Sequence, residues 1–177
     1  RATAIERFTR EAQVTASLRS PHTVELFDFG TGADGTLYYA MELLDGMNLE
    51  HFVYRFGPIE PRRAVHWLRQ ACHSLAEAHA RGLIHRDIKP ANIYLCRYGR
   101  DADFIKLLDF GLSRPLATSP DPNLTQPGTL LGTPAYMAPE QIFGLESAPR
   151  TDLYALGCVG YWLLAGRKPF EGGSAGE

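Results

Sequence analysis

An uncharged stretch rich in apolar residues, 153–166, places the strongest constraint on the fold. It is apolar on every side of a helical projection and ends at Gly166, which predicts a helix over residues 152–165 at the centre of the larger part of the fold. The stretch is too short to span a bilayer, which takes about 20 apolar residues. It therefore predicts a buried core helix, and we expect no membrane contact within this segment.

The composition is typical of one globular domain. The 177 residues include 18 Lys and Arg against 20 Asp and Glu, a net charge of −2. This charge disfavours nucleic acid as a partner, because phosphate backbones require clustered basic residues. Cys72, Cys96 and Cys158 form no C-x-x-C pair that could hold zinc or act as a redox couple, which favours a reducing, cytoplasmic compartment. Residues 1–8 lack the apolar run of an export signal.

The first part of the chain predicts a helix followed by a hairpin. Apolar residues recur at three- and four-residue intervals from Ile5 to Leu18, which predicts a helix that ends before Ser20. Two β-rich runs, residues 24–29 and 37–42, flank a glycine-rich hexapeptide. The hexapeptide spells G-x-G-x-x-G, but no helix follows it, so a hairpin turn explains these glycines better than a phosphate-binding loop.

The second part predicts a long helix, another hairpin and a long loop. The helix begins near Pro61 and stops near Gly82. Short β-rich runs at residues 93–96 and 104–108 predict the hairpin. Residues 111–135 contain five prolines and show no period, as expected of a functional loop. The predicted inward stripe of the helix consists of Val65, Leu68, Cys72, Leu75 and His79.

An ordered set of polar motifs follows the long helix. Residues 85–92 read HRDIKPAN, residues 109–111 read DFG, and residues 138–140 read APE. This order resembles the catalytic loop, the metal-binding triplet and the end of the activation segment of eukaryotic-like protein kinases. The resemblance covers essentially the whole chain. A Lys two residues after Asp87 and the sequence GTPAY at residues 132–136 resemble the serine/threonine branch, and the Arg-rich composition resembles its bacterial members.

The resemblance implies a role in phosphoryl transfer for five side chains. Asp87 would orient the substrate hydroxyl and accept its proton. Asn92 and Asp109 would hold Mg²⁺, which prefers oxygen ligands and usually retains several waters. Lys89 would neutralise the γ-phosphate of ATP, and Thr133 would hydrogen-bond Asp87 and Lys89. ATP and Mg²⁺ are the implied cofactors, and protein substrates are the implied partners.

The residues themselves predict where the Lys89 ammonium lies. Pro90 disfavours a helical backbone at Lys89. Residues two apart in an extended segment point to the same side. We therefore expect the ammonium to share a side with Asp87.

The resemblance also implies nucleotide contacts and structural or regulatory positions. The hinge that reads adenine through its backbone would include Met41, Glu42 and Leu44, and Tyr94 would pack beneath the adenine ring. Arg86 would pair with a phosphorylated loop residue, for which Thr125 and Thr129 are the candidates. The remaining implied positions are Glu11, which pairs with an ATP-contacting Lys; His85 and Phe110, which stack in a spine with Leu26 and Thr15; Gly111 of the DFG triplet; Glu140, which pairs with an Arg beyond this chain; and Asp152, which anchors the catalytic-loop backbone.

The implied fold class is α+β: a bilobal, protein-kinase-like fold. A single incomplete kinase domain would occupy residues 1–177, with part of the small lobe at 1–41, the hinge at 42–47 and part of the mostly helical large lobe at 48–177. Family members carry a Gly-rich loop and a strand Lys before the helix that holds Glu11, whereas the first lysine here is Lys89. We therefore expect a domain truncated at both ends that transfers phosphate poorly by itself.

The expected function is transfer of the ATP γ-phosphate to Ser or Thr hydroxyls of proteins, by the cytoplasmic kinase domain of a parent that other segments could anchor to a membrane. One alternative is a pseudokinase or interaction module, which the intact Asp87, Asn92 and Asp109 disfavour. Another is a small-molecule phosphotransferase, which Lys89 and the sequence from residue 132 to 140 disfavour. His66, His73 and His79 lack zinc-site spacing, so we expect packing or surface roles for them.

Overall fold

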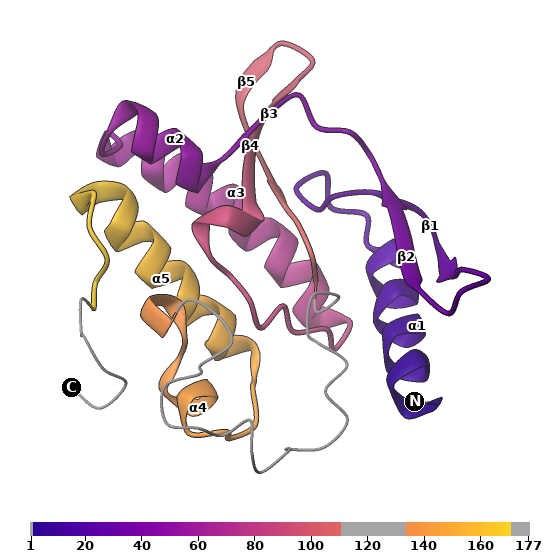
Figure 1. The fold of residues 1–177 in the computed structure, drawn as a ribbon. Helices are drawn as coiled ribbons and strands as arrows, with labels where there is room; N and C mark the ends of the chain where they lie inside the picture. Colours follow the sequence, from indigo (N-terminus) through magenta and orange to yellow (C-terminus); the bar gives the residue numbers. More distant parts are fainter. Residues whose placement is uncertain (1, 111–133, 171–177) are drawn as a thin grey trace.

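The computed structural model describes residues 2–110 and 134–170, and its elements form two groups (Figure 1). One group holds helix α1 (Ala2–Ser17) and the strands β1 (Leu26–Thr31) and β2 (Leu37–Met41). The other is built around the helices α3 (Pro61–Ala80) and α5 (Pro149–Ala165). It also contains β3 (Gly46–Asn48), α2 (Leu49–Phe56), the 3₁₀ turn η1 (Pro90–Asn92), β4 (Ile93–Tyr98), β5 (Asp101–Leu107), the 3₁₀ turn η2 (Pro134–Tyr136) and α4 (Pro139–Ile142).

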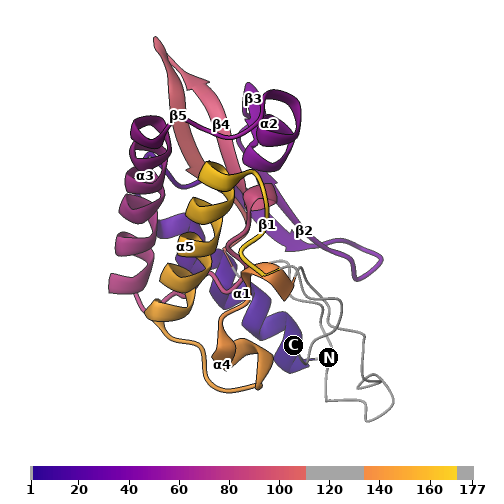
Figure 2. The same ribbon diagram turned by 90° about the vertical axis from the view of Figure 1, so that its left-hand side faces the viewer.

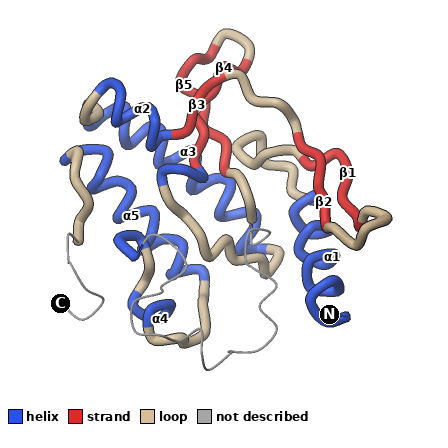
Figure 3. Tube along the Cα trace, viewed as in Figure 1, coloured by secondary structure: helices blue, strands red, loops and turns tan. Residues whose placement is uncertain are grey.

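The first group confirms the predicted helix and hairpin. Strands β1 and β2 pair antiparallel, with Leu26 opposite Met41 and Thr31 opposite Leu37, and α1 packs against β1 (Figure 3). In the connecting turn, Gly32 donates its N–H to the carbonyl of Thr36 at 2.7 Å. These glycines therefore form a hairpin turn, as the sequence indicates.

The second group contains an antiparallel sheet in the order β3-β4-β5. The β4–β5 hairpin was predicted, whereas the short strand β3 was not. At Gly46, a Cβ atom would lie 2.1 Å from the carbonyl oxygen of Leu95, so only glycine allows β3 to approach β4 this closely. Helix α3 packs against both β5 and α5 (Figure 2). The core between them includes Trp67, Leu75, Ile105, Leu107 and Leu163.

The inward face of α3 differs from the predicted stripe. Leu75 is buried as expected, but Val65 is 55% exposed and Cys72 is also exposed. The prediction was wrong because a second apolar series satisfies the same helical spacing, and its small alanines allow close packing of neighbouring elements. The residues on the buried face are Ala64, Trp67, Gln70, Ala71, Ser74, Leu75 and Ala78.

Helix α5 is confirmed, and Gly166 ends it in the left-handed conformation with φ +69°. The expectation that every side of this helix is buried is wrong for the described residues, since Leu153 is 52% exposed and Leu164 is 48% exposed. An apolar sequence shows that a face can be buried but not which neighbour covers it. Within residues 2–110 and 134–170, no helix combines the length and apolarity that crossing a bilayer requires.

Candidate active site

A carboxylate from α5 holds the backbone of the segment that follows α3. Asp152 is 1% exposed and accepts the N–H groups of His85 at 2.9 Å and Arg86 at 2.8 Å. Arg86 has φ +67°, a left-handed conformation that is costly for a residue with a Cβ. Charge-assisted hydrogen bonds are stronger than neutral ones and offset such strain. Asp152 therefore fixes the backbone just before Asp87.

His79 also contacts this carboxylate. Its Nε2 lies 2.7 Å from Oδ2 of Asp152, so a residue of α3 joins the contact between α5 and the loop. The sequence predicts a packing or surface role for His79, and nothing in its spacing indicated this contact. The carboxylate of Asp152 thus connects α3, α5 and the loop.

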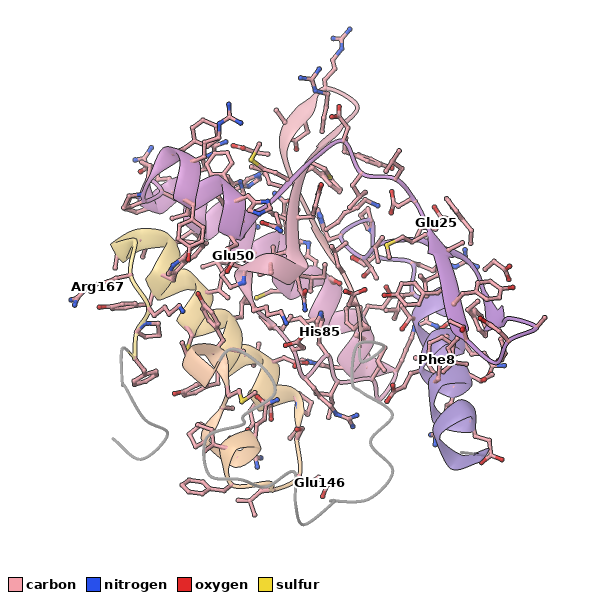
Figure 4. The ribbon with its side chains drawn as sticks, viewed as in Figure 1. Phe8, Glu25, Glu50, His85, Glu146 and Arg167 are labelled. Carbon is pink, nitrogen blue, oxygen red and sulfur yellow. The ribbon has the colours of Figure 1, made fainter. Side chains whose placement is uncertain are left out.

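His85 lies near the centre of the molecule and is fully buried (Figure 4). Its Nε2 lies 2.7 Å from the carbonyl oxygen of Leu108, and its Nδ1 accepts the N–H of Asp87 at 3.3 Å. Because a carbonyl can only accept, Nε2 carries the hydrogen and the ring is neutral. Burial lowers the pKa of His85. The ring also packs against Phe110, with 4.8 Å between centroids, which fits a structural role for both side chains.

Two side chains fix one oxygen of Asp87. Lys89 Nζ lies 2.8 Å from Oδ2, and Asn92 Nδ2 donates to the same oxygen at 2.9 Å and to the Asp87 carbonyl at 2.8 Å. The backbone at Lys89 is extended, with φ −156° and ψ 162°, which confirms the expectation drawn from Pro90. The carboxylate is thus held in one orientation, with an ammonium beside it.

Asp109 lies beside this group. Leu108 donates its N–H to the carbonyl of Asn92 at 3.0 Å, which brings the backbone before Asp109 next to Asn92. Tyr39, on β2, donates its hydroxyl to Oδ1 of Asp109 at 3.0 Å. Burial, followed by the charge of Asp109, raises the pKa of Tyr39 to about 12. No pattern in the sequence indicated that Tyr39 reaches this site.

The donor set suits Mg²⁺. Because the amide nitrogen of Asn92 faces Asp87, its amide oxygen faces away from Asp87. A carboxamide oxygen and a carboxylate are hard ligands of the kind that Mg²⁺ prefers, with waters and phosphate oxygens completing the shell. Asn92 and Asp109 therefore fit the role of holding the ion.

The expected hinge is held by a buried lysine. Glu42 accepts from Lys106 Nζ at 2.5 Å and from the Glu25 N–H at 2.8 Å. Lys106 was not among the predicted site residues. Tyr94 donates its hydroxyl to the carbonyl of Gly46 at 3.1 Å. Met41 and Leu44 are both partly buried. The segment that contains them is thus attached to β5 at Glu42 and to β4 at Gly46.

Glu11 reaches the catalytic loop from α1. Its Oε1 lies 3.5 Å from Nη1 of Arg86, which forms an ion pair between the two groups of elements. Thr15 is buried and donates its hydroxyl to the carbonyl of Glu11 at 2.9 Å, while Leu26 is also buried. The pair of Glu11 with Arg86 was not expected. The expected partners of Arg86, Thr125 and Thr129, lie outside the described residues, as do Gly111 and Thr133.

Helix α4 brings two polar side chains to the site. Glu140 accepts the hydroxyl of Thr151 at 2.6 Å, and this hydrogen bond lowers the pKa of Glu140. Its pairing with an Arg remains a prediction. Gln141 donates to the carbonyl of Arg86 at 2.8 Å, a contact that the sequence analysis missed. Residues 86–89 and 136–137 line a small cavity of about 20 Å³ together with Gln141 and Ala155.

Comparison with curated proteins finds serine/threonine-protein kinases. Serine/threonine-protein kinase pkn3 of Myxococcus xanthus is 41% identical over 172 residues, which is 97% of this chain and 31% of the relative. PknH of Mycobacterium tuberculosis is 42% identical over 171 residues, 97% of this chain and 26% of the relative. The chain thus spans about a third or less of the curated relatives it matches.

Solved structures show the same similarity. Rad53 1–466 in complex with AMP-PNP superposes with a TM-score of 0.77 at 32% identity, over 95% of this chain and 40% of that one. The Mycobacterium tuberculosis PknI kinase domain gives a TM-score of 0.72 at 32% identity, over 96% of this chain and 59% of that one. The protein kinase domain family matches residues 1–177. This match, together with the catalytic loop and the neighbouring Asp109, shows that the chain belongs to the protein kinase family, with relatives among the bacterial serine/threonine kinases.

Proposed function

We propose that the protein containing this chain transfers the γ-phosphate of ATP to Ser or Thr hydroxyls of protein substrates in a Mg²⁺-dependent reaction. The observation that carries the proposal is the Asp87 carboxylate, whose Oδ2 is held by both Lys89 and Asn92. Phosphoryl transfer requires mainly positioning and charge neutralisation, and this arrangement supplies an oriented carboxylate next to a cation.

In this proposal each side chain has one task. Asp87 orients the substrate hydroxyl and accepts its proton, since a carboxylate within hydrogen-bond reach can do both. The Lys89 ammonium neutralises charge on the γ-phosphoryl group. Asn92 and Asp109 hold Mg²⁺, which supplies charge neutralisation at the ATP phosphates when bound. Thr133 would hydrogen-bond Asp87 and Lys89.

The nucleotide is proposed to lie against the hinge at residues 42–47, between a small lobe at residues 1–41 and a large lobe that starts at residue 48. The backbone around Met41, Glu42 and Leu44 would read adenine, with Tyr94 beneath the ring. The ion pair of Glu42 with Lys106 supports this, because it rigidifies the segment that would contact adenine. Phosphorylation at Thr125 or Thr129 would give Arg86 an anionic partner.

A peptide of residues 1–177 alone is proposed to transfer phosphate slowly. It holds no Gly-rich loop or lysine before Glu11, so no side chain within it can take the ATP-contacting Lys role. Assays therefore belong in the natural protein with all residues that its gene encodes.

The test is Asp87→Asn in that protein, assayed for Mg²⁺-dependent transfer from labelled ATP to protein. We expect kcat to fall about 100- to 10,000-fold, the usual range for loss of a general base, with KM for ATP unchanged. Asp101→Asn, an exposed change at the tip of the β4–β5 hairpin, is the control and should keep its rate. An unchanged rate in the Asp87 variant would remove Asp87 from this role, and an inactive wild-type protein would favour a scaffold.

A further inference from the structure

We propose that Gln141 is a positioning residue for the catalytic loop, which it connects to the start of α4. Its Nε2 donates to the carbonyl of Arg86 at 2.8 Å, and its Oε1 accepts the N–H of Ala138 at 3.1 Å. The inference rests on the proposed function of Asp87, because it concerns how that carboxylate is held.

Side chains from two helices hold the backbone at Arg86. The N–H of Arg86 is held by Oδ1 of Asp152 at 2.8 Å, and its carbonyl is held by Gln141. Both peptide groups that flank this left-handed residue are thus hydrogen-bonded by side chains, one from α5 and one from α4. A strained conformation persists only where its surroundings over-determine it.

The contact at the Arg86 carbonyl also constrains Asp87. The Arg86 carbonyl and the Asp87 N–H belong to one planar peptide group, so fixing the oxygen also fixes the N–H. That N–H donates to Nδ1 of His85 at 3.3 Å, which is a long bond. Gln141 therefore supports the peptide group that precedes the Asp87 Cα atom, on the side opposite to its weak hydrogen bond with His85.

The catalytic loop faces the segment before α4. A cavity of about 20 Å³ lies between them, lined on one side by Asp87 and Lys89 and on the other by Tyr136 and Met137. The cavity has room for about one water molecule. Gln141 bridges it with one donor and one acceptor on a single planar amide, which holds the loop at a fixed distance from Ala138.

The chemistry of the amide gives a sharp test. Gln141→Glu keeps an acceptor for the Ala138 N–H but places a carboxylate oxygen against the Arg86 carbonyl oxygen. Gln141→Lys keeps a donor for that carbonyl and loses the acceptor. If the Arg86 contact positions Asp87, kcat of the natural protein should fall about 10- to 100-fold in the Glu variant and less in the Lys variant, with KM for ATP unchanged.

Gln70 provides a matched control. It makes the same two kinds of contact between α3 and β5, donating to the carbonyl of Asp103 at 2.9 Å and accepting the N–H of Ile105 at 2.8 Å. Gln70→Glu should lower thermal stability at least as much as Gln141→Glu, without the fall in kcat. Equal falls in kcat for the two variants at a temperature where both are folded would overturn the proposal.

A second readout does not depend on activity. In hydrogen exchange followed by mass spectrometry, Gln141→Glu should speed exchange in the peptide covering residues 83–92, whereas Gln70→Glu should speed it at residues 101–107. Unchanged exchange over residues 83–92 would refute the proposal. If the wild-type protein transfers no phosphate, the proposed function fails, and the exchange result alone still decides the role of Gln141.

Discussion

Lys106 and Glu42 form an ion pair, with 2.5 Å between Nζ and Oε1, that joins β5 to the segment after β2. The side chain of Lys106 is 6% exposed and that of Glu42 is 20% exposed. The Glu25 N–H shares the same carboxylate oxygen at 2.8 Å. One carboxylate thus links the β1–β2 hairpin to the three-stranded sheet.

Removing the lysine should expose how much this link contributes to stability. Lys106→Met leaves the Glu42 carboxylate without its cation, and breaking a buried pair usually costs about 3–5 kcal/mol. Because Glu42 is partly solvated, we expect a loss of about 2–3 kcal/mol in the free energy of unfolding, measured by urea titration. The double variant with Glu42→Gln should recover part of that loss, since no unpaired charge then remains. Strictly additive losses would show that the two groups do not interact.

The three longer helices, α1, α3 and α5, and the two hairpins followed from periodicity and turn residues, because these patterns are local, whereas the short helices α2 and α4 were not predicted. The strand β3 could not be predicted, since it spans only Gly46–Asn48 and exists through pairing with β4. The inward face of α3 was misjudged because Val65 and Cys72 are as apolar as the residues that face the core. Burial depends on neighbours distant in sequence, which periodicity does not report.

The candidate site was predictable where its residues lie in one short motif. Lys89 and Asn92 both contact Asp87 within residues 85–92, and the spacing had indicated the side on which Lys89 lies. Tyr39 and Gln141 approach the site from distant segments through single hydrogen bonds. Tyrosine and glutamine are common at many surface and packing positions, so no local pattern marks them.

Stability should decrease in mild acid because of His85. Burial lowers its pKa below the unfolded value of about 6.5, so between the folded and unfolded pKa values the unfolded chain binds more protons. The contribution is fully present above about pH 6.5 and is lost as the pH falls. We expect a slope of up to about 1.4 kcal/mol per pH unit just below pH 6 in urea titrations.

His85→Phe is the matching variant for this pH dependence. It keeps a ring against Phe110 but cannot titrate, so its stability should vary less between pH 5.5 and 7.5. Burial also lowers the pKa of His22, so a smaller dependence should remain. Identical pH profiles for the wild type and the variant would exclude His85 as the source.

Gly46 should not tolerate a side chain. An added Cβ would lie 2.1 Å from the Leu95 carbonyl oxygen and 2.7 Å from Cα of Cys96, and both are backbone atoms that cannot rotate away. We expect Gly46→Ala to cost about 3 kcal/mol, at the upper end for overpacking, and to separate β3 from β4. Gly157→Ala, on the exposed side of α5, is the control, since an added Cβ would lie within 4 Å of no described residue beyond the adjacent turns of its own helix; it should stabilise the helix by up to about 1 kcal/mol. A loss at Gly157 comparable to that at Gly46 would contradict this explanation.

Tyr39→Phe should weaken metal binding more than it slows transfer. The hydroxyl orients Asp109, a proposed Mg²⁺ ligand, through Oδ1, and loss of a partner that orients a metal ligand typically costs about 10- to 100-fold in metal affinity. In the natural protein we therefore expect the Mg²⁺ concentration for half-maximal rate to rise about tenfold, with kcat at saturating Mg²⁺ nearly unchanged. Binding of Mn²⁺ with ADP, followed by electron paramagnetic resonance, measures the same affinity without turnover.

The neighbouring tyrosine provides the control for this experiment. Tyr38 also donates its hydroxyl to a carboxylate, Oδ2 of Asp28 at 3.2 Å, but on the exposed side of β2. Tyr38→Phe removes the same atom and the same type of bond, so it should leave the Mg²⁺ dependence and the Mn²⁺ affinity unchanged. Equal shifts in both variants would mean that loss of a hydroxyl from β2, rather than the orientation of Asp109, controls the metal site.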